Sequence, residues 1–488
     1  MRQRFERQLD LGQTPIEEVP IPPKSRDELP PVLRGLQWIF QTPEINEQIF
    51  QLLEQKVQGT KQATGRPGMD LWHVLVLGVV RLALDCDYDR LEYLVHYDTL
   101  LRRIMGLESH FRGEFGQGFH QKTLSENVCH IDEAFLAEIN AIVVKAGRSV
   151  FKKKDDEPLR AKSDTYVLES NVHFPTDLNL LWDACRKCLD VLPRLARAHH
   201  LPGWRKASLW QTQLRTFLRI CGTIHHGGGA KKHERLQKAV TAYLQKAYAL
   251  EQKVFASLGE LRAQPLSLVA QSLLVEVEYY HEKLIKHLDL IERRVLKGET
   301  IPHAEKDFSL FEPHTEWINK GKVSPAVELG HKVLITTDQY SLILDYKPMT
   351  QSSDVKETLP LADRLLSKFG DECFQSWSLD KGFSAQQDRE LLELFIPEVI
   401  MPKKGRRSQA DQARETQPTF RRLRRQHSAI ESNINALEHH GLNRCPDKGW
   451  SGFQRYVGFG VLAYNLHKIG NRLLAQDRQR QSRLKQAA

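Results

Sequence analysis

The chain has 488 residues, of which 41% are hydrophobic and 27% are charged, and its net charge is +9. A chain of this length is too long to fold around one hydrophobic core, so we expect several domains. No stretch reaches the roughly 18 uninterrupted apolar residues of a membrane span, and the first residues lack the apolar centre of a secretory signal. Seven unevenly spaced cysteines fit a reducing compartment, so we expect a cytoplasmic protein that does not enter membranes.

The first 150 residues predict an arm followed by helices. Residues 1–40 are rich in proline and charge, which is typical of a flexible N-terminal arm. In residues 41–150, Asp70 can cap a helix that runs to Ala83, a second helix covers 88–97, and Asp132 can cap a third. Short helices joined by tight turns suit a helical DNA-binding domain. They equally suit a plain helical bundle.

The pattern changes at residue 160. The run KSDTYVLE has the β-branched and aromatic content of a strand, so residues 151–200 predict the first part of a sheet-containing core. Strand-like runs are then absent from residues 201–325. Within this segment, two long stretches repeat apolar residues at spacings of three and four on either side of Pro265, which predicts an antiparallel helical hairpin and hence a helical insertion.

Strands return in residues 326–470, the predicted second part of the core. Residues 332–337 and 341–346 predict a β-hairpin, and a helix from about Pro360 ends at Gly370. Next come a strand ending at Asp380, a helix, a short strand and a long helix that opens at Pro418 and closes at Gly441. Residues 471–488 form a basic C-terminal tail.

This element order predicts an α/β core combined with all-α parts. The core order is strand, helical insertion, hairpin, helix, strand, helix, strand, helix, which describes a mixed sheet with flanking helices. Without the insertion, it is the order of a ribonuclease H-like domain, where acidic residues lie on the first strand, beside the fourth strand and on the last helix. Here those places hold Asp164, Asp380 and Glu431.

These three carboxylates are the candidate catalytic and metal-binding residues. Cleavage of a phosphodiester needs an aligned nucleophile and a neutralised leaving oxygen, and divalent ions can supply both effects. Carboxylate oxygens suit Mg²⁺, and we expect Mn²⁺ to substitute for it. Taken singly, each aspartate favours an ordinary structural role, Asp164 as a turn residue at a strand end and Asp380 as the first residue of an Asp-Lys-Gly turn.

A basic cluster just before Glu431 predicts contact with DNA phosphates, since such a cluster releases many counterions on binding. The alternative is a solvated loop and helix face. The candidate DNA-binding residues are Lys403, Lys404, Arg406, Arg407, Arg421, Arg422, Arg424, Arg425 and His427. The last of these would contact a phosphate only when protonated.

Several blocks occur together in a recognisable order. They are GRPGMDLWHVLVLGVVRLALDCDYDRLEYLVHYDTLLRRIMGLE, SDTYVLESNVHFPTD, FEPHTEWINKGK with VELGHKVLITTD, LDKGFS, and HSAIESNINALEHHGLNRCPDKG. With these blocks the chain resembles the DDE transposases of bacterial insertion sequences. The resemblance implies an enzyme of DNA recombination that binds the terminal inverted repeats of a mobile element, cleaves there and joins the ends to target DNA. It also implies a homodimer on DNA and a nucleoid-associated protein.

One departure from the family pattern leaves an alternative open. Related transposases often carry Tyr, Arg and Lys around the catalytic glutamate, where this chain has Arg424, His427 and Glu438. The alternative is a catalytically inactive, transposase-derived DNA-binding protein. A scaffold protein built on the helical hairpin is a third reading.

Overall fold

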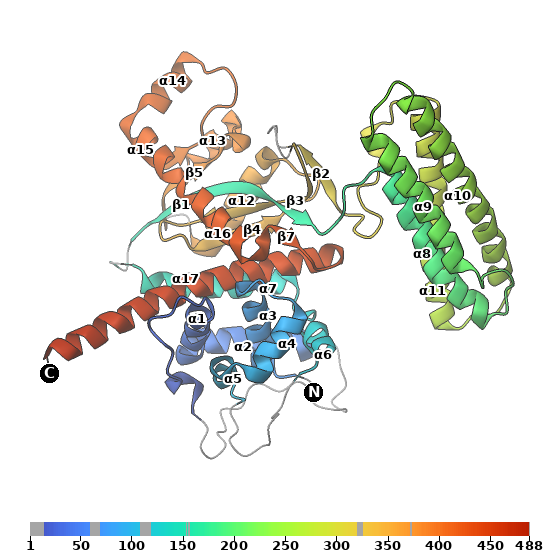
Figure 1. Ribbon diagram of the computed structural model, residues 1–488. Helices are drawn as coiled ribbons and strands as arrows, with labels where there is room; N and C mark the ends of the chain where they lie inside the picture. Colours follow the sequence, from blue (N-terminus) through green and yellow to red (C-terminus); the bar gives the residue numbers. More distant parts are fainter. Residues whose placement is uncertain are drawn as a thin grey trace. The chain divides into compact units, whose positions relative to one another are not determined.

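The computed structural model describes residues 14–58, 69–107, 119–152, 154, 157–319, 326–370 and 373–487. The chain divides into two compact units (Figure 1). The first unit combines Met1–Asn171 with Ile318–Ala488, and the second is Val172–Trp317. Each unit is described by itself.

Seven strands of the described residues form one mixed sheet. Its main path is β2-β3-β1-β5-β6, while β4 pairs with β3 and β7 pairs with β1. β1 is antiparallel to β3 and parallel to β5, so the sheet changes direction at β1. The strands are β1 (Leu159–Ser170), β2 (Glu316–Asn319), β3 (Val327–Thr337), β4 (Ile343–Pro348), β5 (Phe374–Leu379), β6 (Glu398–Ile400) and β7 (Arg444–Cys445).

The strands predicted from β-branched and aromatic runs are confirmed. β3 and β4 form the expected antiparallel hairpin, and β5 ends one residue before Asp380. Buried polar groups fasten the central strands, because Trp377 Nε1 donates to Ser163 Oγ at 2.7 Å and Ser163 Oγ lies 2.7 Å from Thr336 Oγ1. These partners satisfy polar atoms that would be costly to bury alone.

The helices of the first unit cover the sheet and build an N-terminal bundle. The expected caps are present, since Asp70 accepts from the Trp72 N–H and Asp132 from the Phe135 N–H. The helices are α1 (Leu29–Gln41), α2 (Pro43–Gln58), α3 (Leu71–Ala83), α4 (Tyr88–Tyr97), α5 (Thr99–Ile104), α6 (Gln121–Val128), α7 (Glu133–Gly147), α12 (Asp354–Phe369), α13 (Gln386–Leu392), α14 (Gln409–Thr416), α15 (Pro418–His427), α16 (Ala429–Leu437) and α17 (Gly449–Ala487).

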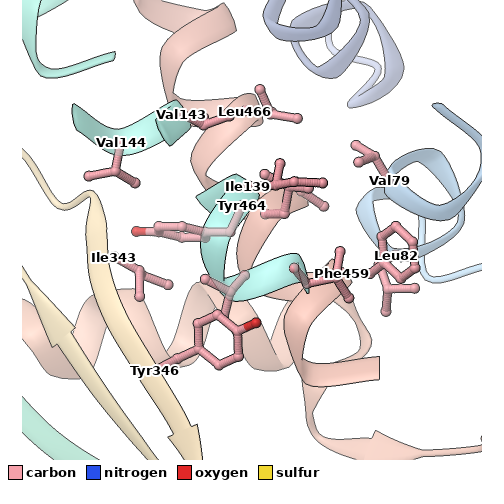
Figure 2. Packing of buried hydrophobic residues seen from close by; sticks show 14 of the residues in the cluster. Val79, Leu82, Ile139, Val143, Val144, Ile343, Tyr346, Phe459, Tyr464 and Leu466 are labelled. Carbon is pink, nitrogen blue, oxygen red and sulfur yellow. The ribbon is translucent and has the colours of Figure 1, made fainter. Parts of the chain in front are cut away.

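Helix α17 joins the N-terminal helices to the sheet. It packs against α1, α3 and α7 on one side and β4 on the other (Figure 1). Figure 2 shows Phe459, Tyr464 and Leu466 of α17 among side chains of α3, α7 and β4. One continuous hydrophobic core therefore runs from the N-terminal helices into the sheet.

Two predictions about the ends of the chain are wrong in part. Residues 14–40 are not a loose arm, because α1 buries Val32, Leu33 and Leu36 against α17; residues 1–13 lie outside the described part. Residues 471–487 continue α17 instead of forming a separate tail. A side chain at Gly470 would place its Cβ 1.7 Å from the Pro31 oxygen, so glycine permits the close approach of these two helices.

The second unit is all helical. The predicted antiparallel hairpin is confirmed as α10 (Lys232–Arg262) and α11 (Leu268–Ile291), which pack with α8 (Asp177–Ala198) and α9 (Ala207–His226) around their own core. The unit begins at Val172 and not at residue 201, because α8 packs mainly on α11 and α9.

None of the described helices combines the length and the apolar content that crossing a bilayer requires.

Candidate active site

Strand register brings Asp164 and Asp380 together. β1 and β5 run parallel with Ser163 opposite Leu379. The next residue of each chain segment is an aspartate, Asp164 within β1 and Asp380 at the end of β5, where it begins the 3₁₀ turn Lys381–Phe383. Both carboxylates are partly buried. The pairing of the two strands thus sets the spacing of the two acids.

Glu431 approaches from the first turn of α16. The helix is anchored through Asn433, whose Nδ2 donates to Thr337 Oγ1 at 3.4 Å and whose Oδ1 accepts from the Tyr464 hydroxyl at 3.0 Å. Ile430 is fully buried, while Glu431 is exposed. Glu431 is close enough to help raise the pKa of Asp164. Glu431 therefore stands on a late helix, as expected, with its side chain exposed beside a buried neighbour.

The expected long helix begins at Pro418 but divides after His427 into α15 and α16. At the break, Ser428 Oγ donates to the Arg425 oxygen at 2.9 Å. A serine hydroxyl bonded back to the preceding turn bends a helix, which accounts for the division.

The two aspartates have opposite proton affinities. Burial raises the pKa of Asp164 to about 7, and the negative charges of Asp380, Asp354 and Glu431 add to this effect. Burial acts in the same direction on Asp380, but the Lys381 N–H and the Arg424 guanidinium outweigh it, so the pKa of Asp380 lies below its usual value. Adjacent carboxylates with separated pKa values are typical of sites that handle protons and charge.

Asp354 is a fourth carboxylate that sequence reasoning missed. It is the first residue of α12, and its Oδ1 accepts from Lys332 Nζ at 2.9 Å and from Thr165 Oγ1 at 3.3 Å. A Cβ at Gly382 would lie 2.4 Å from Asp354 Oδ2. Asp354 thus links the residue after Asp164 to the turn after Asp380. An aspartate at a helix start is ordinary, so the sequence carried no special signal.

The side chain of His427 is buried, so it is not in a position to contact a phosphate as a charged group. Its side chain is 4% exposed, and neither ring nitrogen has a hydrogen-bond partner among the described residues, although the Ser378 backbone lies near. Burial, followed by the positive charge of Arg424, lowers its pKa to about 4. The imidazole is therefore neutral near pH 7, which corrects the expectation of a protonated contact.

Some cations of the basic cluster form ion pairs within the protein, and other members are exposed. Arg424 Nη2 lies 3.0 Å from Asp380 Oδ1, and Arg407 Nε lies 3.1 Å from Glu415 Oε2. Lys403 is only partly exposed, and its backbone N–H donates to Glu415. Within the described part of the chain, the exposed members without an ion pair are Lys404, Arg406, Arg421, Arg422 and Arg425.

Glu438 lines a cavity of about 540 Å³ beside the C-terminal end of β1. Glu169, Glu328, His439 and Arg444 also line it. Glu169, Glu328 and Glu438 give the cavity wall three carboxylates, against the one guanidinium of Arg444.

The donor chemistry of the three candidate ligands fits Mg²⁺, which prefers carboxylate oxygens. In the described residues, however, no three His, Cys, Asp or Glu side chains converge closely enough to hold a metal ion. The Arg424 guanidinium occupies one oxygen of Asp380 in this arrangement. Ligation by all three would need side chains to move.

Comparison of the chain with protein-family models, with curated proteins and with solved structures gives no match. Functional reasoning therefore rests on the residues and their geometry.

Proposed function

We propose that the chain is a DDE transposase with a ribonuclease H-like core. It binds the terminal inverted repeats of an insertion sequence, cleaves the DNA by metal-dependent phosphodiester hydrolysis and joins the ends to target DNA. The observation that carries the proposal is the side-by-side position of Asp164 and Asp380 on parallel strands, with Glu431 acting on the same carboxylate. The change of strand direction at β1 also suits such a core.

Asp164, Asp380 and Glu431 would hold Mg²⁺ or Mn²⁺, which would activate the attacking oxygen and neutralise the leaving one. Asp164 and Asp380 must each change state before they can bind a metal ion. With a pKa of about 7, Asp164 is only partly ionised near pH 7 and must lose its proton to become a ligand. Asp380 is already ionised and must part from Arg424.

The exposed cations of the basic cluster would hold the DNA backbone beside the carboxylates. Arg421, Arg422 and Arg425 stand on α15, the helix that leads directly to Glu431. Phosphate contacts of this kind position a duplex without reading its sequence. Both the element ends and the target DNA are partners in this proposal, and two copies of the chain pair the ends on the nucleoid.

A plasmid nicking assay tests the function. The substrate is a supercoiled plasmid that carries the coding sequence together with the DNA flanking it. We expect nicking with Mg²⁺ or Mn²⁺ by the natural protein, and none by Asp164→Asn, Asp380→Asn or Glu431→Gln, while all three still bind the flanking DNA. Asp363→Asn, which changes an exposed carboxylate of α12, is the matched control and should nick normally.

The results separate the alternatives. Normal nicking by all three variants would refute the assigned carboxylates. A natural protein that binds the flanking DNA but never nicks it with either metal would support the inactive, transposase-derived DNA-binding protein. That second reading is favoured by one observation, the guanidinium seated on Asp380.

A further inference from the structure

We propose that the Arg424 guanidinium occupies the Asp380 carboxylate and keeps metal ions from binding there. A DNA phosphate would then attract the guanidinium away and free Asp380 for the metal. This inference rests on the proposed function, because it concerns how the same carboxylates become competent.

The geometry gives Arg424 two attachments at the end of β5. Nη2 lies 3.0 Å from Asp380 Oδ1, and Nη1 donates to the Leu379 backbone oxygen at 3.3 Å. The guanidinium thus spans the last strand residue and the carboxylate after it. A divalent ion bound to Asp380 would meet both an occupied oxygen and a like charge.

The contact is open to exchange. The Arg424 and Asp380 side chains are 31% and 40% exposed, so water and solute reach the pair. A partly exposed ion pair of this kind contributes little to the stability of the fold, so breaking it has a small free-energy cost. Asp380 offers Arg424 a single oxygen, whereas a phosphate can accept two parallel hydrogen bonds from the same guanidinium.

The neighbouring charges indicate where a phosphate would come from. Arg421 lies one turn before Arg424 on α15, and Arg425 follows it directly; both are exposed. A DNA backbone attracted by these two arginines would arrive within reach of Arg424. Moving the guanidinium onto the phosphate would free Asp380 at the moment when substrate is present.

Asp380 has no second cation paired with it in the residues that the structure describes. Arg424 is the one described residue whose side chain forms an ion pair with this carboxylate. Once the guanidinium leaves, the carboxylate therefore needs a new cation, and a metal ion supplies it.

Metal binding by the full-length protein tests the inference. Mn²⁺ affinity is measured calorimetrically without DNA for the natural protein, Arg424→Gln, the control Arg480→Gln and Asp380→Asn. We expect Arg424→Gln to bind Mn²⁺ about tenfold more tightly, which corresponds to about 1.4 kcal/mol. Arg480→Gln, which changes an exposed arginine of α17 outside the site, should bind as the natural protein does, and Asp380→Asn should lose binding.

A second measurement adds an arbitrary DNA duplex at saturating concentration. The natural protein should then gain Mn²⁺ affinity, and Arg424→Gln should gain much less. Arg424→Lys, which keeps the charge but not the planar fork, should fall between the two and also serves if the glutamine variant folds poorly.

The outcomes distinguish the two proposals. Equal Mn²⁺ affinity of the natural protein and Arg424→Gln, lost in both on replacing Asp380, would overturn the role of Arg424 and leave the proposed function standing. Absence of any Asp380-dependent Mn²⁺ binding, with and without DNA, would overturn both.

Discussion

A buried ion pair between α3 and the segment before α17 gives a quantitative test of how the N-terminal helices are held. Arg81 Nη2 lies 2.6 Å and Nη1 3.2 Å from the two oxygens of Asp447. The two side chains are 5% and 10% exposed, and the guanidinium stacks 4.3 Å from the Tyr88 ring centroid. Removing one partner of such a pair leaves a buried charge uncompensated, which costs about 3 to 5 kcal/mol.

We expect Asp447→Asn to lower the free energy of unfolding by about 3 kcal/mol, the lower end of that range, because the amide oxygen can still accept one hydrogen bond. The matched control is Asp477→Asn on α17. Asp477 meets Arg34 through one contact of 3.2 Å, with side chains 33% and 14% exposed, so its loss should cost at most about 1 kcal/mol.

Urea unfolding followed by far-ultraviolet circular dichroism measures both variants against the natural protein. The reasoning fails if Asp447→Asn destabilises the chain no more than Asp477→Asn. A second variant, Arg81→Met with Asp447→Leu, removes both charges together. It should recover only part of the lost stability. The Arg81 charge leaves together with its partner, but Arg455, whose Nη2 lies 3.8 Å from Asp447 Oδ2, still loses that carboxylate.

Two further predictions concern pH and the site. Burial lowers the pKa of His73 to about 4, below the 6.5 of the unfolded chain, so its contribution is complete above pH 6.5 and is lost as pH falls towards 4, by at most about 3 kcal/mol. His73→Gln should flatten urea midpoints between pH 7 and 5; an unchanged pH dependence would contradict this. Gly382→Ala should displace Asp354 and slow nicking while DNA affinity holds, whereas Gly259→Ala, which meets open space, should leave both unchanged.

Elements with local signals could be predicted from the sequence. Helix α3 begins after the Asp70 cap, and α4 occupies the expected residues 88–97. The β3–β4 hairpin and the α10–α11 hairpin were also predictable, because the apolar spacing and the turn residues that indicate them lie within each segment. The positions of Asp164 on the first strand and of Asp380 directly after β5 followed from the strand-like runs of the sequence.

Elements that depend on distant partners could not be predicted. Helix α1 was expected to be part of a loose arm, since the prolines and charges of residues 1–40 gave no sign of the apolar face that α17 covers most extensively. Helix α12 begins at Asp354, so Pro360 lies inside it, where packing of Leu361 and Leu365 outweighs the missing N–H. The Asp354 contacts with Lys332 and Thr165 join residues that are remote in sequence.

The places of Arg424, His427 and Glu431 along α15 and α16 bring all three to the aspartates. They follow one another at intervals of three and four residues across the junction after His427, so they share one face of the two consecutive helices. That face meets the aspartates: Arg424 bonds to Asp380, His427 is buried beside it, and Glu431 acts on Asp164. A substitution at either of the first two positions therefore changes the charge next to the aspartates and not only the affinity for DNA. On this face Arg424 supplies a cation beside Asp380, and His427 is a buried ring with a lowered pKa, so under the proposed function control of the acidic residues would fall to Arg424.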